Sequence, residues 1–132
     1  MREILFRGKR IDSGEWAEGY YVPMGEYHYI LTGRLELVPY LDFEHFPVNP
    51  ETVGRFSGLT DRNGVKIFEG DIVHVKARSC SFTGCVIYWP EEARYVCKTK
   101  FDMRYAICNK FEFEVLGNIY DNPELLEVNK ND

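Results

Sequence analysis

Cysteines and histidines are the residues of this chain that could bind a metal ion. The cysteines are Cys80, Cys85, Cys97 and Cys108, and the histidines are His28, His45 and His74. Zinc sites favour short paired spacings such as Cys-x2-Cys, and neither set contains a spacing of that kind. We therefore predict no metal site, and we expect Cys97 and Cys108 to lie on strands as small apolar residues.

Pairs of acidic side chains could support general acid–base catalysis. The candidates are Glu91 with Glu92, and Asp61 with Asp71. The first pair follows Pro90 in an expected turn, where charged side chains are usually just solvated. The chain also lacks a glycine-rich phosphate loop and a nucleophile elbow. The sequence therefore predicts a non-enzymatic protein with no catalytic residue and no cofactor.

A stretch near the C-terminal third interleaves basic and aromatic residues. Its members are Arg94, Tyr95, Lys98, Lys100, Phe101 and Arg104. Against Asp102, its four Lys and Arg residues give residues 94–104 a balance of +3. On a small barrel such a stretch could bind single-stranded nucleic acid by stacking bases on exposed rings. The alternative is a hairpin with one charged face and its aromatics in the core. The net charge of -5 favours that alternative, because proteins that bind phosphate backbones are usually basic.

The elements that would position these residues are β-strands. The chain has 132 residues, enough for one domain or two small ones. Val, Ile, Thr, Phe, Tyr and Trp make up a third of it, and these side chains favour pleated sheets. The longest apolar runs are a few residues, far short of the ~20 that a membrane helix needs, and the N-terminus lacks the pattern of a secretory signal. We therefore expect a soluble all-β protein in the cytoplasm.

Turn residues divide the chain into short β-rich runs with the spacing of a small barrel. Strands are expected at 4–7, 16–22, 28–31, 53–57, 72–77, 84–88, 95–99, 105–108 and 113–120. Residues 34–52 contain three prolines and are expected to form a loop anchored by aromatic side chains. One short helical turn is expected near the C-terminus, where Asn122 can cap it and Pro123 suits its first position.

Two turns shape the expected barrel. Asn63-Gly64 predicts a hairpin with a type I′ turn and positive φ at both residues. Gly70 is expected to reverse the chain with positive φ, while Asp71 bonds the backbone that follows it. A strand that begins at Gly70-Asp71 and is followed by another at Gly84 is typical of SH3-like barrels.

Residues 1–10, 50–73 and 114–126 together resemble the YopX family of phage and prophage proteins. The residues that carry the match within the last two stretches are Gly58, Leu59, Asp61, Asn63, Gly64, Ile67, Glu69, Gly70, Asp71, Gly117, Asn118, Asn122 and Pro123. The resemblance implies a small β protein with an SH3-like barrel, found in a bacterial host cell, and it implies no defined activity. Most of these residues suit turns, caps or a core, so we expect the motif mainly to specify the fold.

These observations predict one YopX-like unit with three parts. Residues 1–49 form an N-terminal β meander with the aromatic loop, residues 50–128 form the SH3-like barrel, and residues 129–132 form a polar tail. Four aromatic residues are expected to leave surfaces that self-association covers: Trp16, Tyr20, Tyr21 and Trp89. We therefore expect a homo-oligomer that acts as an assembly or protein-interaction module, with a host or phage protein as a further partner. The runner-up is a nucleic-acid-binding barrel, and an acidic mimic of nucleic acid is the weakest alternative.

Overall fold

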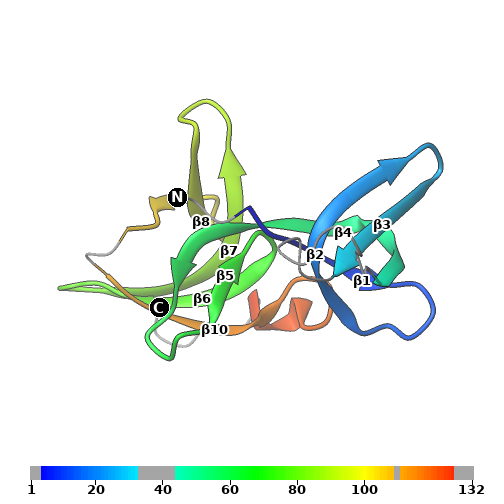
Figure 1. The fold of residues 1–132 in the computed structure, drawn as a ribbon. Coiled ribbons are helices and arrows are strands. Elements are labelled where there is room, and N and C mark those ends of the chain that lie inside the picture. Colours follow the sequence, from blue (N-terminus) through cyan, green and yellow to red (C-terminus); the bar gives the residue numbers. More distant parts are fainter. Residues whose placement is uncertain (1–3, 33–43, 109–110, 127–132) are drawn as a thin grey trace. The chain divides into compact units, whose positions relative to one another are not determined.

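The computed structural model describes residues 4–32, 44–108 and 111–126. Almost all of its regular structure is antiparallel β-strand, and one 3-10 turn, η2 (Pro123–Leu126), lies near the C-terminus of the described part (Figure 1). The predictions of an all-β fold and of a short C-terminal helical turn are confirmed. The chain divides into two compact units, Met1–Phe56 and Ser57–Asp132.

The first unit is a closed ring of four strands. These are β1 (Phe6–Arg10), β2 (Trp16–Met24), β3 (Tyr27–Thr32) and the first part of β4 (Glu44–Thr60). β1, β2, β3 and β4 pair in that order, and β4 returns to pair with β1. The expected meander of three strands is therefore extended by a fourth strand that closes it.

A small core fills this ring. Its buried members are Ala17, Ile30 and Val48, and four partly buried side chains pack against them: Phe6, Tyr21, Phe46 and Val53. Gly19 sits where β2 approaches β3 so closely that a Cβ atom there would overlap the carbonyl oxygen of Leu31. The small residue at position 19 therefore permits the strand spacing that closes the ring.

The prediction of a loop at 34–52 is wrong for its described part, since β4 already begins at Glu44. Val48 is fully buried in the first core, and this burial outweighs the poor strand preference of the flanking prolines. Pro47 pairs with Tyr29 of β3, and Pro50 lies where the register between β1 and β4 shifts, a place that tolerates a missing N–H donor. Pro39 lies outside the described residues. The boundary between the two units falls within β4, after Phe56. The sequence analysis placed the boundary after residue 49.

The second unit contains the end of β4, the short strand β5 and a five-stranded sheet. The strands are β5 (Lys66–Phe68), β6 (Asp71–Lys76), β7 (Ser81–Trp89), β8 (Arg94–Thr99), β9 (Arg104–Ala106) and β10 (Glu112–Asn118). The sheet has the order β10-β6-β7-β8-β9, and β5 pairs with β4. β5 was missed in the sequence because three residues are too few to show an alternating pattern.

The main core cluster of the second unit lies on one face of its sheet. Its buried residues are Ile67, Val73, Val75, Phe82, Val86, Cys97 and Phe113, and Leu59 of β4 packs against them. Cys97 is thus an apolar core residue of β8, and burial raises the pKa of its thiol to about 12, with a smaller contribution from Cys85. Cys108 is half-buried and lies after the end of β9, so its expected place on a strand is wrong.

Candidate interaction surfaces

The basic and aromatic stretch 94–104 forms the β8–β9 hairpin. Lys98 lies opposite Arg104, and Arg94 lies opposite Trp89 of β7. Because directly paired residues share a face and alternate residues point the same way, Arg94, Lys98 and Arg104 lie on one face of the sheet. Tyr95 lies on the other face, where it packs against the core. The stretch is therefore divided between two faces.

Each cation of this face has a carboxylate partner. Arg94 forms an ion pair with Glu92. Lys98 and Arg104 share Asp102, with nitrogen–oxygen distances of 3.2 and 3.4 Å. When the acids at 91, 92 and 102 are included, residues 91–104 carry four cations and three anions, a balance of +1. The apparent basic patch is thus largely neutralised by acids in the β7–β8 and β8–β9 turns.

The aromatic residues of this hairpin also have different surroundings. The ring of Tyr95 meets that of Tyr88 edge to face, with centroids 5.2 Å apart. Phe101, at the tip, is 70% exposed, and the Lys100 ammonium lies 5.1 Å from its centroid. The guanidinium of Arg104 lies 5.1 Å from the centroid of the half-buried Trp89. Of the aromatic residues in the predicted nucleic-acid site, Phe101 alone faces solvent.

Asp61 of the family motif joins two distant segments of the second unit. Its Oδ1 accepts the backbone N–H groups of Asn63 and Val65, at 2.8 and 2.9 Å, and its Oδ2 accepts that of Val115 in β10, at 3.0 Å. Burial raises the pKa of this carboxyl, but the three backbone donors and a nearby arginine together hold it below the ordinary value of 3.8. The ionised carboxylate therefore ties the β4–β5 turn to β10.

The same carboxylate explains a correction at Asn63-Gly64. Positive φ occurs at Gly64 (81°) and not at Asn63, so the turn is not type I′. The N–H of Gly64 donates to the carbonyl of Asp61 at 3.0 Å, and the N–H of Asp61 donates to the carbonyl of Val65 at 2.8 Å. This is the longer hairpin loop in which a left-handed glycine follows a type I turn. The side chain of Asp61 favours it by binding two amides of the loop.

A second group of motif residues gathers around Gly70, whose φ is 92° as expected. The N–H of Gly70 donates to Val86 of β7 at 2.8 Å, and its carbonyl accepts from Ile119 at 2.9 Å. Asp71 accepts the N–H of Phe68, three residues earlier, at 2.8 Å. This bond is to the backbone before the turn, whereas the sequence predicted a bond to the backbone that follows.

Asn118 and Asn122 connect β10 to η2. Oδ1 of Asn118 accepts the N–H groups of Tyr120 and Asp121, at 3.0 and 2.9 Å. The side chain of Asn122 accepts the N–H of Asn118 at 3.3 Å instead of capping η2, whereas its backbone carbonyl accepts from Leu125 at 3.0 Å. The expected capping by the Asn122 side chain is therefore wrong. Gly117 lies against this side chain, where a Cβ atom would overlap Asn122 Oδ1.

The remaining motif residues have local roles in the second unit. Gly58 has a φ of 91°, and Leu59 and Ile67 pack in the core. Glu69 precedes the Gly70 turn, and Pro123 begins η2. The structure thus brings the motif residues together at turns and around a core, and the motif remains predicted to specify the fold.

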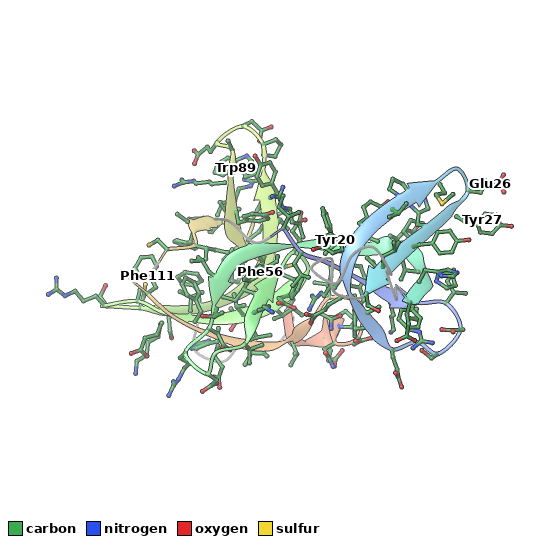
Figure 2. All side chains as sticks on the ribbon, in the orientation of Figure 1. Tyr20, Glu26, Tyr27, Phe56, Trp89 and Phe111 are labelled. Atoms are coloured by element: carbon green, nitrogen blue, oxygen red, sulfur yellow. The ribbon has the colours of Figure 1, made fainter. Side chains whose placement is uncertain are left out.

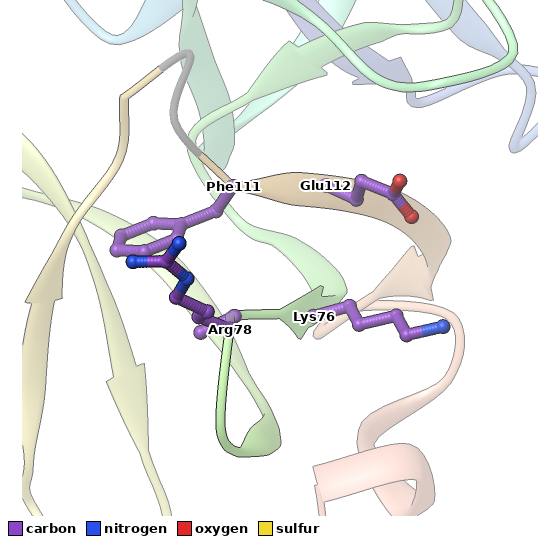
Figure 3. A pocket seen from close by; sticks show the side chains of 5 residues that line it. Lys76, Arg78, Phe111 and Glu112 are labelled. Carbon is purple, nitrogen blue, oxygen red and sulfur yellow. The ribbon is translucent and has the colours of Figure 1, made fainter.

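An open depression lies at the end of β6 beside the start of β10. It has a volume of about 520 Å³ and is lined by Lys76, Ala77, Arg78, Phe111 and Glu112. Figure 3 shows the Arg78 guanidinium beside the Phe111 ring, while Lys76 and Glu112 point away from them. Lys76 and Glu112 are cross-strand partners. The depression brings together one aromatic ring and one cation over a shallow surface.

Groups of three or more His, Cys, Asp or Glu side chains able to hold a metal ion are absent from the described part of the chain. Within the same residues, no helix has the length and apolar character needed to cross a bilayer.

The β2–β3 hairpin carries an apolar surface that the sequence analysis missed. Its cross-strand pairs include Tyr20 with Leu31, Val22 with Tyr29, and Met24 with Tyr27. These pairs alternate with the pair of Tyr21 and the fully buried Ile30, so all six residues lie on the face opposite the core. We call this surface the outer β2–β3 face. The alternation of Glu18, Tyr20, Val22 and Met24 in the sequence could have revealed it.

Three residues of this face are markedly exposed. Tyr20, Met24 and Tyr27 expose 41%, 61% and 63% of their surface, while Val22, Tyr29 and Leu31 are half-buried. Figure 2 shows Tyr27 beside Glu26 at the end of the hairpin. None of the six side chains of this face carries a formal charge.

The four aromatic residues that were expected to form exposed surfaces differ in their surroundings. Tyr20 belongs to the outer β2–β3 face, while Tyr21, on the other face, stacks with His28. The Arg7 guanidinium lies 4.7 Å from the centroid of Trp16, and Trp89 lies beneath Arg104. Tyr20 is therefore the one exposed member of this set, and the other three are half-buried.

The model of the YopX protein family matches residues 6–127, nearly the whole length, so the chain belongs to this family. The comparison with curated proteins found no match. Among solved structures, the chain is similar to the crystal structure of protein EF1440 from Enterococcus faecalis, with a TM-score of 0.56 and 22% identity. The alignment covers 96% of this chain and 99% of that one. At this identity the likeness concerns the fold alone.

Proposed function

We propose that this YopX-family protein is a non-enzymatic protein-interaction module that self-associates and serves assembly. The observation that carries the proposal is the exposure of large apolar side chains on the β2–β3 hairpin. Met24 and Tyr27 of this hairpin are each more than half exposed. Clustered apolar side chains on a folded surface are typical of protein–protein contact sites.

The biological setting is part of the same proposal. The resemblance of residues 1–10, 50–73 and 114–126 to phage and prophage proteins supports a role in a phage or an integrated element. The expected site of action is the cytoplasm of the bacterial host, where a host or phage protein is a further partner. Purification of the tagged chain from the host and identification of what co-purifies tests this setting.

Light scattering on the purified full chain tests self-association. At micromolar concentration we expect a mass above the 15.5 kDa of one chain, increasing with concentration. A constant mass of one chain over the whole range would overturn the self-association on which the proposal rests.

A second candidate function is binding of single-stranded nucleic acid through the β8–β9 hairpin. The observation that favours it is the common face of Arg94, Lys98 and Arg104, with Arg104 stacked on Trp89. The carboxylate partners of all three cations weaken it. It predicts that single-stranded oligonucleotides bind at low salt and that Lys98→Glu with Lys100→Glu abolishes this binding. The absence of binding by the native chain at low salt contradicts it.

A further inference from the structure

We infer that the outer β2–β3 face is the surface on which a second copy of this chain docks. This inference rests on the proposed self-association and names the surface and the partner that account for it. The six residues that form this face are Tyr20, Val22, Met24, Tyr27, Tyr29 and Leu31.

The local composition of this face is typical of an interface. All three of its cross-strand pairs are uncharged, in a chain with 28% charged residues. The charged neighbours, Glu18 and Glu26, lie at the two ends of this set of pairs in β2 and in the turn. Aromatic residues and methionine are enriched in protein interfaces, and charged residues are depleted from their centres. The outer β2–β3 face has this composition.

The charge of the molecule also favours a second copy at this face. Each copy carries a net charge of -5, so two copies repel one another, and least where the surfaces that meet contain no acids. An uncharged face satisfies this condition in both copies at once, as a two-fold symmetric contact requires. A nucleic acid or a strongly charged peptide would find no countercharge among the six side chains. The charge distribution therefore favours a second copy over these partners.

The exposed apolar area of the outer β2–β3 face can be compared with that of a standard interface. Taking ~200 Å² for a fully exposed side chain of this size, the exposed fractions of Tyr20, Met24 and Tyr27 correspond to roughly 300 Å². The three half-buried residues of the face add to this surface. A standard interface buries about 800 Å² per partner, a little over half of it apolar. The face therefore supplies most of the apolar area that a dimer of standard size needs.

The end of the β2–β3 hairpin is paired with no third strand among the described residues. In β2, residues 16–19 pair with β1, whereas Tyr20 to Met24 pair with β3. Pairing of β3 with β4 begins at Tyr29, so the end of the hairpin is a two-stranded ribbon. Such a ribbon is marginally stable in water when nothing packs on it. A second copy laid on its outer face would bury the exposed side chains and stabilise it.

Matched charge insertions on the two hairpins test the inference. Met24→Glu with Tyr27→Glu places two acids on the outer β2–β3 face. Phe101→Glu with Met103→Glu makes the same change in charge at two comparably exposed positions of β8–β9. In sedimentation velocity we expect the first variant to dissociate, with a dissociation constant raised at least 100-fold. The second variant should change it by less than threefold.

The outcomes separate the inference from the proposed function. If the native chain is a monomer, both fail. If the native chain associates and the two double variants weaken association equally, or neither weakens it, the inference is overturned and the proposed function stands. Circular dichroism checks folding, and Tyr27→Ser, expected to raise the dissociation constant about tenfold, replaces the double variant if that variant unfolds.

Discussion

The β2–β3 and β8–β9 hairpins both combine aromatic residues with an antiparallel pair of strands, yet they present opposite surfaces. The outer β2–β3 face contains six apolar side chains and no charge. The corresponding face of β8–β9 contains three cations, each held by an acid of the same hairpin region. The first surface exposes apolar area and has acids only at its two ends, whereas the charges of the second surface are already paired.

Ion pairs formed within the fold therefore decide whether a basic and aromatic stretch can bind a nucleic acid. Basic residues among aromatics suggest nucleic-acid binding only while the cations are free to meet phosphates. Asp102, which adopts a φ of 65° in the turn, lies between Lys98 and Arg104 and removes much of that capacity. An apolar face has no ion pair of this kind that could replace docking. Its exposed area contributes favourable free energy only when another surface buries it.

The largest expected effect is a loss of stability in the second unit, which contains β8–β9. Asp61→Ala removes the acceptor of three backbone N–H groups, and we expect it to lower the free energy of unfolding by about 3 kcal/mol. Denaturant titration measures this loss. The control is Asp12→Ala, whose solvent-exposed ion pair with Arg10 contributes little to stability, because water and salt screen it. An equal effect of the two substitutions would contradict the role of Asp61.

The stabilisation by Asp61 also depends on pH. Its pKa in the folded protein is lower than the ordinary value of 3.8, so its contribution is complete above that value. It is lost as the pH falls through the lower, folded-state pKa. We therefore expect the difference in stability between the native chain and Asp61→Ala to shrink below about pH 4. A constant difference down to strongly acidic pH would show that the charge of Asp61 is irrelevant.

Single serine substitutions measure how much each hairpin contributes to self-association. Tyr27 and Phe101 are similarly exposed, at 63% and 70%. We expect Tyr27→Ser to weaken self-association about tenfold, equivalent to about 1.4 kcal/mol, because it removes apolar area from the docking face. Phe101→Ser should alter it by less than twofold. Sedimentation at several concentrations distinguishes the two, and a larger effect at Phe101 would reverse the assignment.

Removal of the acids tests whether β8–β9 is neutralised. Asp102→Asn with Glu92→Gln leaves Arg94, Lys98 and Arg104 without their carboxylate partners and changes the net charge from -5 to -3. Asparagine also tolerates the positive φ of position 102. We expect binding of a single-stranded oligonucleotide at low salt to strengthen by roughly threefold to tenfold, measured by fluorescence anisotropy. Unchanged binding would mean that the ion pairs do not limit this surface.

Ionic strength should have the smallest effect. Salt screens the repulsion between two acidic copies, and the outer β2–β3 face has no charge pair to lose. We therefore expect self-association to strengthen by about twofold between low and physiological ionic strength. Any oligonucleotide binding should weaken over the same range. Self-association that weakens with salt would indicate an interface held by ion pairs.

Much of the fold could be predicted because the relevant signals are local. Runs of β-branched and aromatic residues mark β2, β6, β7 and β8, and Pro123 marks the start of η2. The beginning of β4 could not be found in this way, since the burial of Val48 overrides the prolines beside it. The three residues of β5 become a strand only by pairing with β4.

The surfaces were harder to predict than the fold. The partners of Lys98 and Arg104 depend on the turn at Asp102, which alternation along a strand does not reveal. The outer β2–β3 face depends on which of two aromatic-rich faces turns toward the core. Tyr20 and Tyr21 lie on opposite faces because they are adjacent in a strand. The burial of Ile30, the cross-strand partner of Tyr21, shows that the face of Tyr21 is the one toward the core.

Position-specific cross-linking tests the central claim most directly. In a Cys80→Ser background, which removes the exposed cysteine, Tyr27→Cys and Phe101→Cys each place a thiol at one hairpin. The account predicts that a short flexible bis-maleimide links Tyr27→Cys chains into dimers and leaves Phe101→Cys chains and the parent mostly uncoupled. Efficient coupling through Phe101→Cys with none through Tyr27→Cys would contradict it.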